Sequence, residues 1–453
     1  MLGGMRPPPP GAGYGETVLY AGLAPREGET RHVDCEHADR CGGCPVIALS
    51  YGEQLALKRG RVVQSVVRYP ALELVYTEPV QPADPITQYR TRAKLIVAPG
   101  GRLGLYAKGG GHQVVDIPRC QVVSEAIAAV ASLLRARIAA DEEVGGPLAP
   151  FDPSGGGALR AVDLRELRRD GKETVLVTLV VHRRRVSDRA PLEAAARELA
   201  AADPRVVGVA LNFHEGESPQ ILGGETAVIH GVASAPDQIG KATHEATYGS
   251  FVQAHRGQAE RVHGLAVDLL GIRRHERDET ASPRPRVLDL YGGSGAIALT
   301  LAEAGADVHL VESFAPAVAQ VEAAARRAGL TVRAEAADVA SALRRLGEQG
   351  GAPFDAAVTN PPRRGMSPLA RELLARLEIP LIAYVSCDPD TLARDLDHLA
   401  RLGYTAATLR PLDMIPLTDE VETLALLRRT GVQPPKIAYE AVSYTHLTLP
   451  TKA

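Results

Sequence analysis

The stretch RVLDLYGGSGAIALTLA, residues 286–302, decides the fold of this chain. It predicts a hydrophobic strand, a glycine-rich turn and a helix with apolar periodicity. Glycines in such a turn let the backbone approach a ligand closely, and the start of the helix offers free N–H donors. The stretch has neither the three spaced glycines of a dinucleotide fingerprint nor the Gly-Lys-Ser/Thr of a P-loop. We therefore expect a loop for another nucleotide-like cofactor, lined by Tyr291, Gly293 and Gly295.

Further strands are expected downstream of this loop, at 306–311, 331–335, 354–358, 381–386, about 404–411 and 421–427. Because helical segments separate most of them, the pattern predicts an α/β domain with a doubly wound sheet. The last two strands are close enough in sequence to form a hairpin. Glu312 follows the strand 306–311 and is placed to accept hydrogen bonds from both hydroxyl groups of a ribose.

The order of strand, glycine turn, helix, strand and acid resembles the class I S-adenosylmethionine methyltransferases. The resemblance implies S-adenosylmethionine as the cofactor and a reversed hairpin at the end of the sheet. It also places Asp338, after the third strand, where such enzymes hold the adenine amino group. A helix-capping role for Asp338 is an equally good interpretation.

A second stretch, AYVSCDPDTLARDL at 383–396, predicts a short apolar strand that ends at Cys387. Asp388, Pro389 and Asp390 then mark the start of a helix. The thiol falls at the edge where an open α/β sheet binds its ligand. Taken alone, Cys387 would be interpreted as a buried structural cysteine, because free cysteine packs as a small hydrophobe.

The chain carries two more motifs, DAAVTNPPRRG at 355–365 and EVETLALL at 420–427. Together with the cysteine stretch they closely resemble the RNA 5-methyluridine methyltransferases, whose motifs are DPPR-x-G, YVSCNP-x-TLARD and HVE-x-V-x-LL. The similarity runs from about residue 35 to 429. It implies that Cys387 adds to C6 of a uracil, that Glu422 removes the proton from C5, and that the target base is flipped out of its stack.

The resemblance extends to three further positions. Asn360 stands where the family usually has aspartate; the amide keeps the size and the acceptor but loses the charge, so cofactor affinity or substrate orientation is expected to differ. Arg363 and Arg364 follow and are expected to hold RNA phosphates. Gln253, in GSFVQAH, matches a glutamine that contacts the cofactor in the family, although the residues alone favour a helix-start position.

Five cysteines in a chain of 453 residues argue for metal binding or catalysis rather than disulfides. Cys35, Cys41 and Cys44 are clustered, and Cys120 is distant. Three clustered thiolates and a fourth favour a 4Fe-4S cluster over zinc, which would require a second close pair. Family members often carry such a cluster at these positions. Its expected role is structural, because methyl transfer to uracil needs no electron.

The domain organisation follows from these assignments. We expect a disordered, proline-rich leader at 1–31, an iron-sulfur cysteine loop and helix at 32–70, a central α+β domain with an antiparallel sheet at 71–240, the methyltransferase domain at 241–430 and a tail at 431–453 that is non-native at its end.

The central domain is the expected RNA-binding part. Residues 86–190 contain 17 lysines and arginines against 11 aspartates and glutamates, although the whole chain has a net charge of −3. Arg90, Arg92 and Lys94 alternate along one expected strand, so they share a face that suits either phosphates or solvent. Neither a membrane span nor a secretory signal is evident, which predicts a cytoplasmic protein without a membrane partner, and a monomer is expected.

Three alternatives remain open. An amino-group methyltransferase acting on adenine, cytosine or glutamine also uses an N/D-P-P motif, but it places an aromatic residue where this chain has Arg363. A non-catalytic RNA-binding paralogue would not need both Cys387 and Glu422. Within the uridine hypothesis the cysteine motif favours 23S ribosomal RNA over uridine 54 of transfer RNA.

Overall fold

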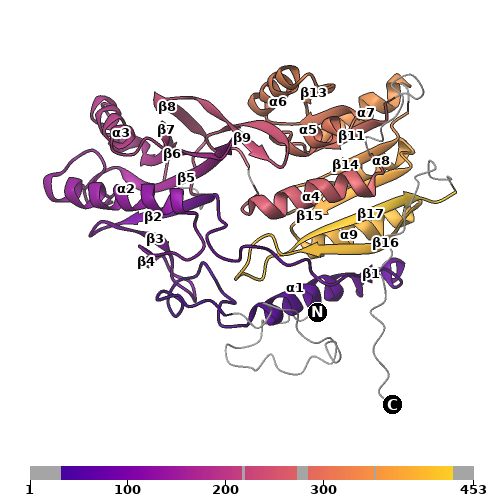
Figure 1. Ribbon diagram of the computed structural model, residues 1–453, viewed down its shortest axis with the longest axis horizontal. Helices are drawn as coiled ribbons and strands as arrows, with labels where there is room; N and C mark the ends of the chain where they lie inside the picture. The colour runs from indigo at the N-terminus through magenta and orange to yellow at the C-terminus, as the bar shows by residue number, and fades with distance from the viewer. Residues whose placement is uncertain (1–31, 217–219, 252, 273–283, 351–352, 432–453) are drawn as a thin grey trace, which may run out of the picture.

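The computed structural model describes residues 32–216, 220–251, 253–272, 284–350 and 353–431. The expected leader at 1–31 and all but the first residue of the expected tail lie outside this part of the chain. Two large sheets organise the described residues (Figure 1), one of eight strands and one of seven.

The eight-stranded sheet has the order β1-β16-β17-β15-β14-β11-β12-β13. Its strands are β1 (Tyr76–Thr77), β11 (Arg286–Leu290), β12 (Asp307–Glu312), β13 (Val332–Ala336), β14 (Ala356–Thr359), β15 (Leu381–Ser386), β16 (Tyr404–Leu412) and β17 (Glu422–Arg429). All neighbours are parallel except β17, which runs antiparallel to both β15 and β16. The predicted doubly wound sheet and its reversed hairpin are confirmed.

Helices cover both faces of this sheet, and alternate residues of β15 show the two layers. Ile382 and Tyr384 belong to a core shared with α1 (Tyr51–Val66), α7 (Val339–Gln349), α8 (Pro368–Arg376) and α9 (Pro389–Arg401). Leu381, Ala383 and Val385 belong to a core shared with α4 (Arg256–Leu269), α5 (Ala296–Glu303) and α6 (Ala315–Ala328). A strand buried on both sides is apolar throughout, as the sequence of β15 is.

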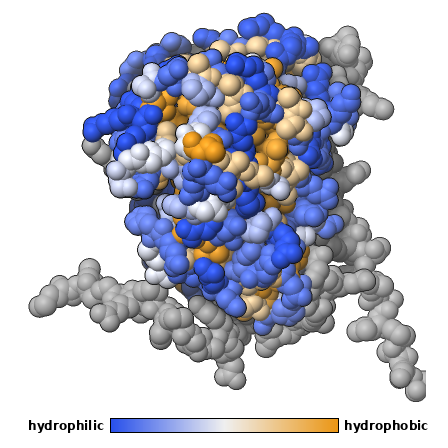
Figure 2. Space-filling model, turned by 90° about the vertical axis from the view of Figure 1, so that its left-hand side faces the viewer, coloured by the Kyte–Doolittle hydropathy of each residue, from blue (hydrophilic) through white to orange (hydrophobic). Residues whose placement is uncertain are grey.

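The seven-stranded sheet has the order β4-β3-β2-β5-β6-β7-β8. Its strands are β2 (Arg92–Ala98), β3 (Arg102–Tyr106), β4 (Val114–Asp116), β5 (Leu159–Arg169), β6 (Lys172–His182), β7 (Val206–His214) and β8 (Glu225–Gly231). Helices α2 (Glu125–Val144) and α3 (Ala190–Ala202) share its main core. The outer face at this end of the molecule is mostly hydrophilic, with scattered apolar residues (Figure 2).

The central sheet is antiparallel, as expected, except at one pair of strands. Strands β6 and β7 are parallel, because α3 forms the crossover connection that parallel neighbours need. A turn at Asp170 and Gly171 links β5 to β6, with φ of 51° and 76°.

The hairpin of β9 (Ser234–Ile239) and β10 (Ala242–Thr247) joins the two sheets. Asp237 in β9 accepts a hydrogen bond from the Arg168 backbone N–H at 3.1 Å, and its carboxylate is 2.6 Å from Nη1 of Arg256 at the start of α4. This buried carboxylate therefore contacts both the central sheet and the methyltransferase domain.

The segment before the central sheet attaches to the methyltransferase sheet. Helix α1 begins at Tyr51, after a capping box formed by Ser50 and Glu53, and its Val62 and Val66 enter the core beneath α9. Strand β1 pairs with β16. The predicted boundary at 70/71 thus falls inside a segment that packs on one domain. None of the described helices is long and apolar enough to cross a lipid bilayer.

Candidate active site

The predicted cofactor residues meet at the carboxyl edge of the eight-stranded sheet. Strands β11, β12, β14 and β15 are parallel there, and their ends carry Tyr291, Glu312, Asn360 and Cys387 respectively. Parallel strands in a doubly wound sheet bind their ligand at this edge. The edge is therefore the candidate active site.

The turn after β11 has the geometry of a ligand cradle. Tyr291, Gly293 and Gly295 all have positive φ, of 60°, 57° and 76°. A Cβ at Gly295 would lie 2.6 Å from Val321 of α6, so the close approach of the two helices requires glycine. The Gly293 N–H donates to Oε2 of Glu312 at 3.0 Å, which places the expected ribose acceptor beside the turn.

The other expected cofactor contacts are Asp338, Asn360 and Gln253. Asp338 caps α7 by accepting a hydrogen bond from the Ser341 N–H at 3.1 Å, so the capping interpretation is confirmed. Burial, and then the nearby Asp338 charge, raise the pKa of Tyr291 to about 12. The Asn360 backbone N–H donates to Leu290 O at 3.2 Å, and its half-buried side chain lies at the edge. Half-buried Gln253 precedes α4, which begins at Arg256.

Cys387 directly follows β15, and Glu422 is the first residue of β17, the strand that pairs with β15. Ser386 pairs with Thr423 in the antiparallel register, so the next position brings 387 opposite 422. Directly opposed residues of such strands have Cβ atoms about 4.5–5.5 Å apart. The Cys387 side chain is half-buried and Glu422 is only 7% exposed.

The electrostatics of this pair follow from burial. Desolvation, and then the neighbouring Glu422 carboxylate, raise the pKa of the Cys387 thiol to about 11. Desolvation, and then Glu420, raise the pKa of Glu422 to about 7. Arg363 opposes both effects. A thiol and a partly protonated carboxyl group are therefore held side by side in a site with a nearby cation.

The loop that carries Arg363 and Arg364 is bound to α9, the helix after Cys387. Thr391 Oγ1 donates to Arg363 O at 2.9 Å, and Arg394 Nη2 donates to Arg364 O at 2.7 Å. The exposed Arg363 side chain reaches Glu420, with Nη2 and Oε1 2.8 Å apart. Glu420 was not anticipated as a site residue. Glu420 lies two residues before Glu422, just ahead of β17, and this closeness in sequence was the available signal.

The basic side chains predicted to bind RNA phosphates in the central domain are partly engaged by other groups of the protein. Arg92 lies in β2, where its Nε and Nη2 atoms are 2.9 and 2.5 Å from the Asp163 carboxylate and Nη1 donates to Ser250 O. Lys94 shares this face, and desolvation and then Arg92 lower its pKa. Arg90 precedes the strand and donates to Arg92 O at 3.1 Å. The Arg92 charge is thus already neutralised within the protein.

The four upstream cysteines are free and half-buried. Cys35, Cys44 and Cys120 pack against the same small apolar core. Burial, and then the charges of Cys120, Cys41 and Cys35, raise the pKa of Cys44 to about 12. Cys41 is paired by a β-bridge with Ala107 after β3, which brings the segment to the central sheet. Across the described ranges, however, no set of three or more His, Cys, Asp or Glu side chains has an arrangement that could hold a metal ion.

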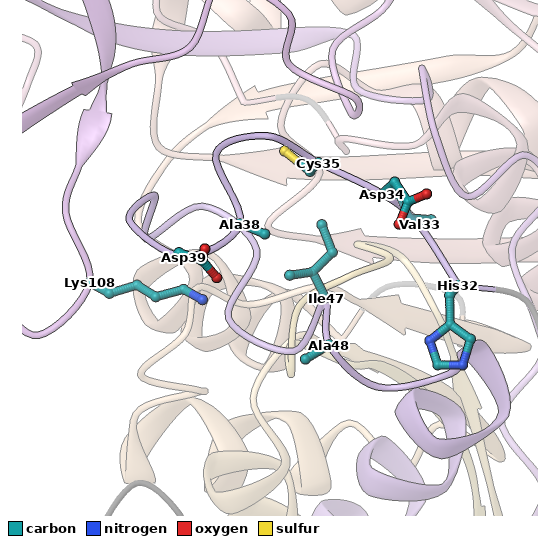
Figure 3. A pocket seen from close by; sticks show the side chains of 9 residues that line it. All are labelled: His32, Val33, Asp34, Cys35, Ala38, Asp39, Ile47, Ala48 and Lys108. Atoms are coloured by element: carbon teal, nitrogen blue, oxygen red, sulfur yellow. The ribbon is translucent and has the colours of Figure 1, made fainter.

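A surface pocket of about 370 Å³ opens beside the cysteine segment (Figure 3). Its lining residues are His32, Val33, Asp34, Cys35, Ala38, Asp39, Ile47, Ala48 and Lys108. The pocket contains neither member of the Cys387–Glu422 pair, so it is separate from the candidate active site.

Comparisons with known proteins place the chain in a class of enzymes. Residues 247–430 match the family model described as tRNA (uracil-5-)-methyltransferase. An uncharacterized RNA methyltransferase of Geobacter sulfurreducens is 31% identical over 410 residues, which cover 89% of this chain and 79% of that protein. Another, from Thermosynechococcus vestitus, is 30% identical over 88% of this chain and 85% of its own length. The chain is therefore an RNA methyltransferase.

A solved structure has the same fold. The tRNA (uracil-54, C5)-methyltransferase of Pyrococcus abyssi, determined with S-adenosyl-L-homocysteine, superposes with a TM-score of 0.64 at 22% identity and covers 85% of this chain and 86% of that one. This chain belongs to the RNA 5-methyluridine methyltransferase family.

The raised pKa of Glu422 predicts a pH-dependent stability. Between its ordinary value of 4.5 and about 7, the folded protein binds more protons at this group than the unfolded chain does, so stability falls as the pH rises. Relative to Glu422→Gln, the wild type should lose up to about 3 kcal/mol of unfolding free energy across this window.

Urea denaturation of both proteins from pH 4 to pH 8 measures the difference. Glu348→Gln, at an exposed position in α7, is the matched control and should track the wild type. A wild-type-minus-variant difference that stays constant with pH would contradict the burial argument.

Proposed function

We propose that this enzyme methylates C5 of uridine in RNA through a covalent adduct between Cys387 and C6 of the base. The observation that carries the proposal is the proximity of Cys387 and Glu422 at the carboxyl edge of the sheet, the same edge that carries the glycine turn. C5 of uracil is a poor nucleophile, so the reaction needs a group that activates it. Covalent addition divides one difficult step into easier ones.

Cys387 performs the first step. Its sulfur forms a bond to C6, the electrons of the C5–C6 double bond move onto the ring as an enolate, and C5 becomes able to attack a methyl group. The thiol must lose its proton for this addition, and its high pKa makes the free thiolate scarce. Arg363 favours the thiolate, because its positive charge opposes the effect of burial.

Glu422 performs the last step. After methylation C5 carries both a methyl group and a proton, and removal of the proton lets the C5–C6 double bond re-form as the C6–S bond breaks. A carboxylate with a pKa near 7 is suited to this task, because a base works best when its pKa is close to the working pH. The thiolate leaves as Cys387 is regenerated.

S-adenosylmethionine, when bound, supplies the methyl group. The donor set at the sheet edge fits it: the turn at Gly293 and Gly295 can approach a ligand closely, and Glu312 stands beside that turn as a ribose acceptor. Asp338 near Tyr291, Asn360 at the end of β14 and Gln253 before α4 are the further candidate contacts.

The RNA is held by cations near the edge. Arg363 and Arg364 lie on the loop beside Cys387 and are the first candidates for phosphates of the flipped nucleotide. Arg90, Arg92 and Lys94 are weaker candidates, since Arg92 is paired with Asp163. The retained pair of Cys387 and Glu422 disfavours a non-catalytic paralogue, and Arg363 in place of an aromatic residue disfavours an amino-group methyltransferase.

We also propose that Cys35, Cys41, Cys44 and Cys120 hold a 4Fe-4S cluster. Four cysteines are the usual ligand set of such a cluster, and Cys35, Cys44 and Cys120 pack against the same small apolar core. In the described residues the thiols are not arranged as a ligand set, so the proposal requires them to move together when the cluster binds. The cluster would act as a cross-link between the cysteine segment and Cys120, the residue that follows β4 by four positions.

The covalent mechanism predicts two opposite phenotypes. Cys387→Ala should abolish both methylation and any RNA–protein adduct, whereas Glu422→Gln should form an adduct that persists because its C5 proton is not removed. RNA with 5-fluorouridine at the target should trap the wild type, since fluorine at C5 cannot leave as a proton. Adducts are measured on denaturing gels with labelled RNA. Undiminished product from Cys387→Ala would refute the mechanism.

We further propose that the target is a uridine of 23S ribosomal RNA, as the resemblance of the cysteine motif implies. In a strain that lacks this gene, 5-methyluridine should disappear from one position of 23S ribosomal RNA, as mass spectrometry of RNA digests would show. Loss at uridine 54 of transfer RNA instead would assign the enzyme to the other branch of the family and contradict the ribosomal proposal.

The cluster proposal predicts the metal content. Anaerobically purified protein should contain iron and sulfide in equal amounts and show a broad absorption near 400 nm, and Cys44→Ser should lose both. Cys387→Ser, which leaves the four ligands intact, is the control. Bound zinc without sulfide would contradict the proposal.

A further inference from the structure

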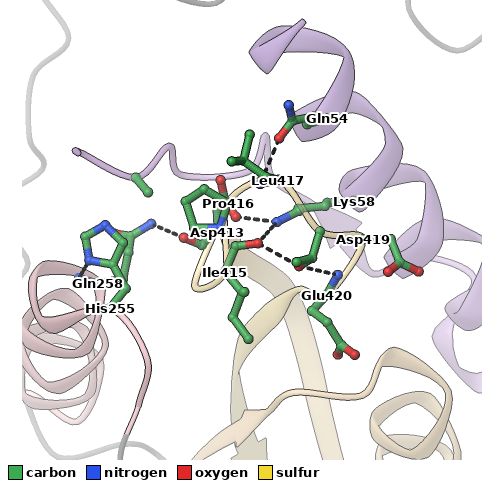
Figure 4. Close-up of polar contacts among 12 residues, drawn as sticks. Gln54, Lys58, His255, Gln258, Asp413, Ile415, Pro416, Leu417, Asp419 and Glu420 are labelled. Carbon is green, nitrogen blue, oxygen red and sulfur yellow. Dashed lines mark hydrogen bonds and ion pairs between the residues drawn. The ribbon is translucent and has the colours of Figure 1, made fainter. Parts of the chain in front are cut away.

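The loop between β16 and β17, residues 413–421, leads directly into Glu422. It begins at Asp413, a fully buried carboxylate. Its partner is Lys58 of α1, which is also fully buried, so the two form an ion pair without solvent access (Figure 4). Lys58 Nζ donates in addition to Ile415 O at 2.9 Å, and Asp413 Oδ2 accepts from Tyr51 OH at 2.8 Å. Two turns of α1 thus hold the first residues of the loop.

More contacts fix the rest of the loop. The Leu417 N–H donates to Gln54 Oε1 at 3.0 Å, and Gln258 of α4 donates to Asp413 O at 3.0 Å (Figure 4). Arg61 of α1 is 2.9 Å from the Asp419 carboxylate. Leu417 has a φ of 68°, a conformation that costs free energy for a non-glycine residue and persists only where the surroundings impose it.

The same helix also reaches the segment after Cys387. Ser65 Oγ donates to Asp390 Oδ1 at 2.7 Å, and Arg68 forms an ion pair with Asp390. Asp390 lies in the first turn of α9, whose amino-terminal cap is Asp388. Helix α1 therefore contacts both chain segments that flank the Cys387–Glu422 pair.

A contribution to the stability of the fold does not by itself explain why Lys58 and Asp413 form a buried ion pair. Removing two charges from water is costly, and well-packed apolar residues of similar size are often as stable or more so. An ion pair is directional, however, and Lys58 must meet a carboxylate and a carbonyl group at once. The pair thereby selects one conformation of the loop.

We propose that Lys58 is a positioning residue that, through Asp413, sets the β16–β17 loop and with it the carboxylate of Glu422. This inference rests on the proposed role of Glu422 as the base that removes the C5 proton. Cys387 is aligned separately, because it follows β15, which is paired on both sides within the sheet. Loss of Lys58 should therefore slow the final elimination more than the addition of the thiol.

The test measures the adduct on ordinary uridine RNA, with the full-length enzyme. Lys58→Met removes the charge but keeps most of the apolar stem. It should lower kcat by about tenfold or more, because a misplaced base loses part of its contribution, and the Cys387–RNA adduct should accumulate as it does in Glu422→Gln. The KM for RNA should change little.

Arg59→Met is the matched control. Arg59 is the next residue of α1, but it donates to Thr77 O of β1, at 3.1 and 2.7 Å, rather than to the loop. This variant should show neither the loss of kcat nor the adduct. The double variant Lys58→Met with Asp413→Leu replaces the pair by apolar residues; it should fold, and it should still accumulate adduct.

The outcomes distinguish failure of the positioning role of Lys58 from failure of the covalent mechanism. Two results would overturn the positioning role of Lys58. One is a Lys58→Met enzyme that turns over slowly but accumulates no adduct. The other is a double variant that regains the full kcat of the wild type. If Lys58→Met fails to fold, the double variant alone decides. If 5-fluorouridine RNA does not trap the wild type, the covalent mechanism itself fails, whatever the Lys58 variants do.

Discussion

The insertion of β17 between β15 and β16, antiparallel to both, is the constraint on which the site depends. In a sheet of parallel strands, the carboxyl ends of all strands lie at one edge and their amino ends lie at the other. Reversing one strand brings its first residue to the catalytic edge. Glu422 is that residue, and the register with Ser386 sets it opposite Cys387. A slip of one residue would turn the carboxylate to the other face of the sheet.

The arrangement is electrostatically unfavourable, as functional sites often are. A buried glutamate stands beside a half-buried thiol and a second carboxylate, Glu420, and both reacting groups resist ionisation. Arg363 is the compensating cation, although its pairing with Glu420 reduces its effect. Binding of a phosphate would compete with Glu420 for Arg363. The surrounding scaffold, and α1 in particular, supplies the rigidity that such a site requires.

The catalytic domain could be predicted well because its signals are local. The glycine turn and the strands β11 and β15 appear at their predicted bounds, and Cys387 and Glu422 followed from motifs. Strand β5 was missed because charged residues interrupt its apolar pattern; Arg165 and Glu166 are nevertheless buried beside Asp237 and Arg256. The Lys58–Asp413 pair joins positions 355 apart, and nothing local in either segment indicates the other.

The central claim is that one sulfur and one carboxylate, held side by side, act on two adjacent atoms of the same ring, C6 and C5. A structure of the enzyme trapped on 5-fluorouridine RNA in the presence of S-adenosylmethionine tests it most directly. The account predicts continuous density from Cys387 Sγ to C6, with a Glu422 oxygen within about 3 Å of the substituent on C5 that stands in for the proton. A flipped base bound at the sheet edge without that bond, or with Glu422 directed away from C5, would contradict it.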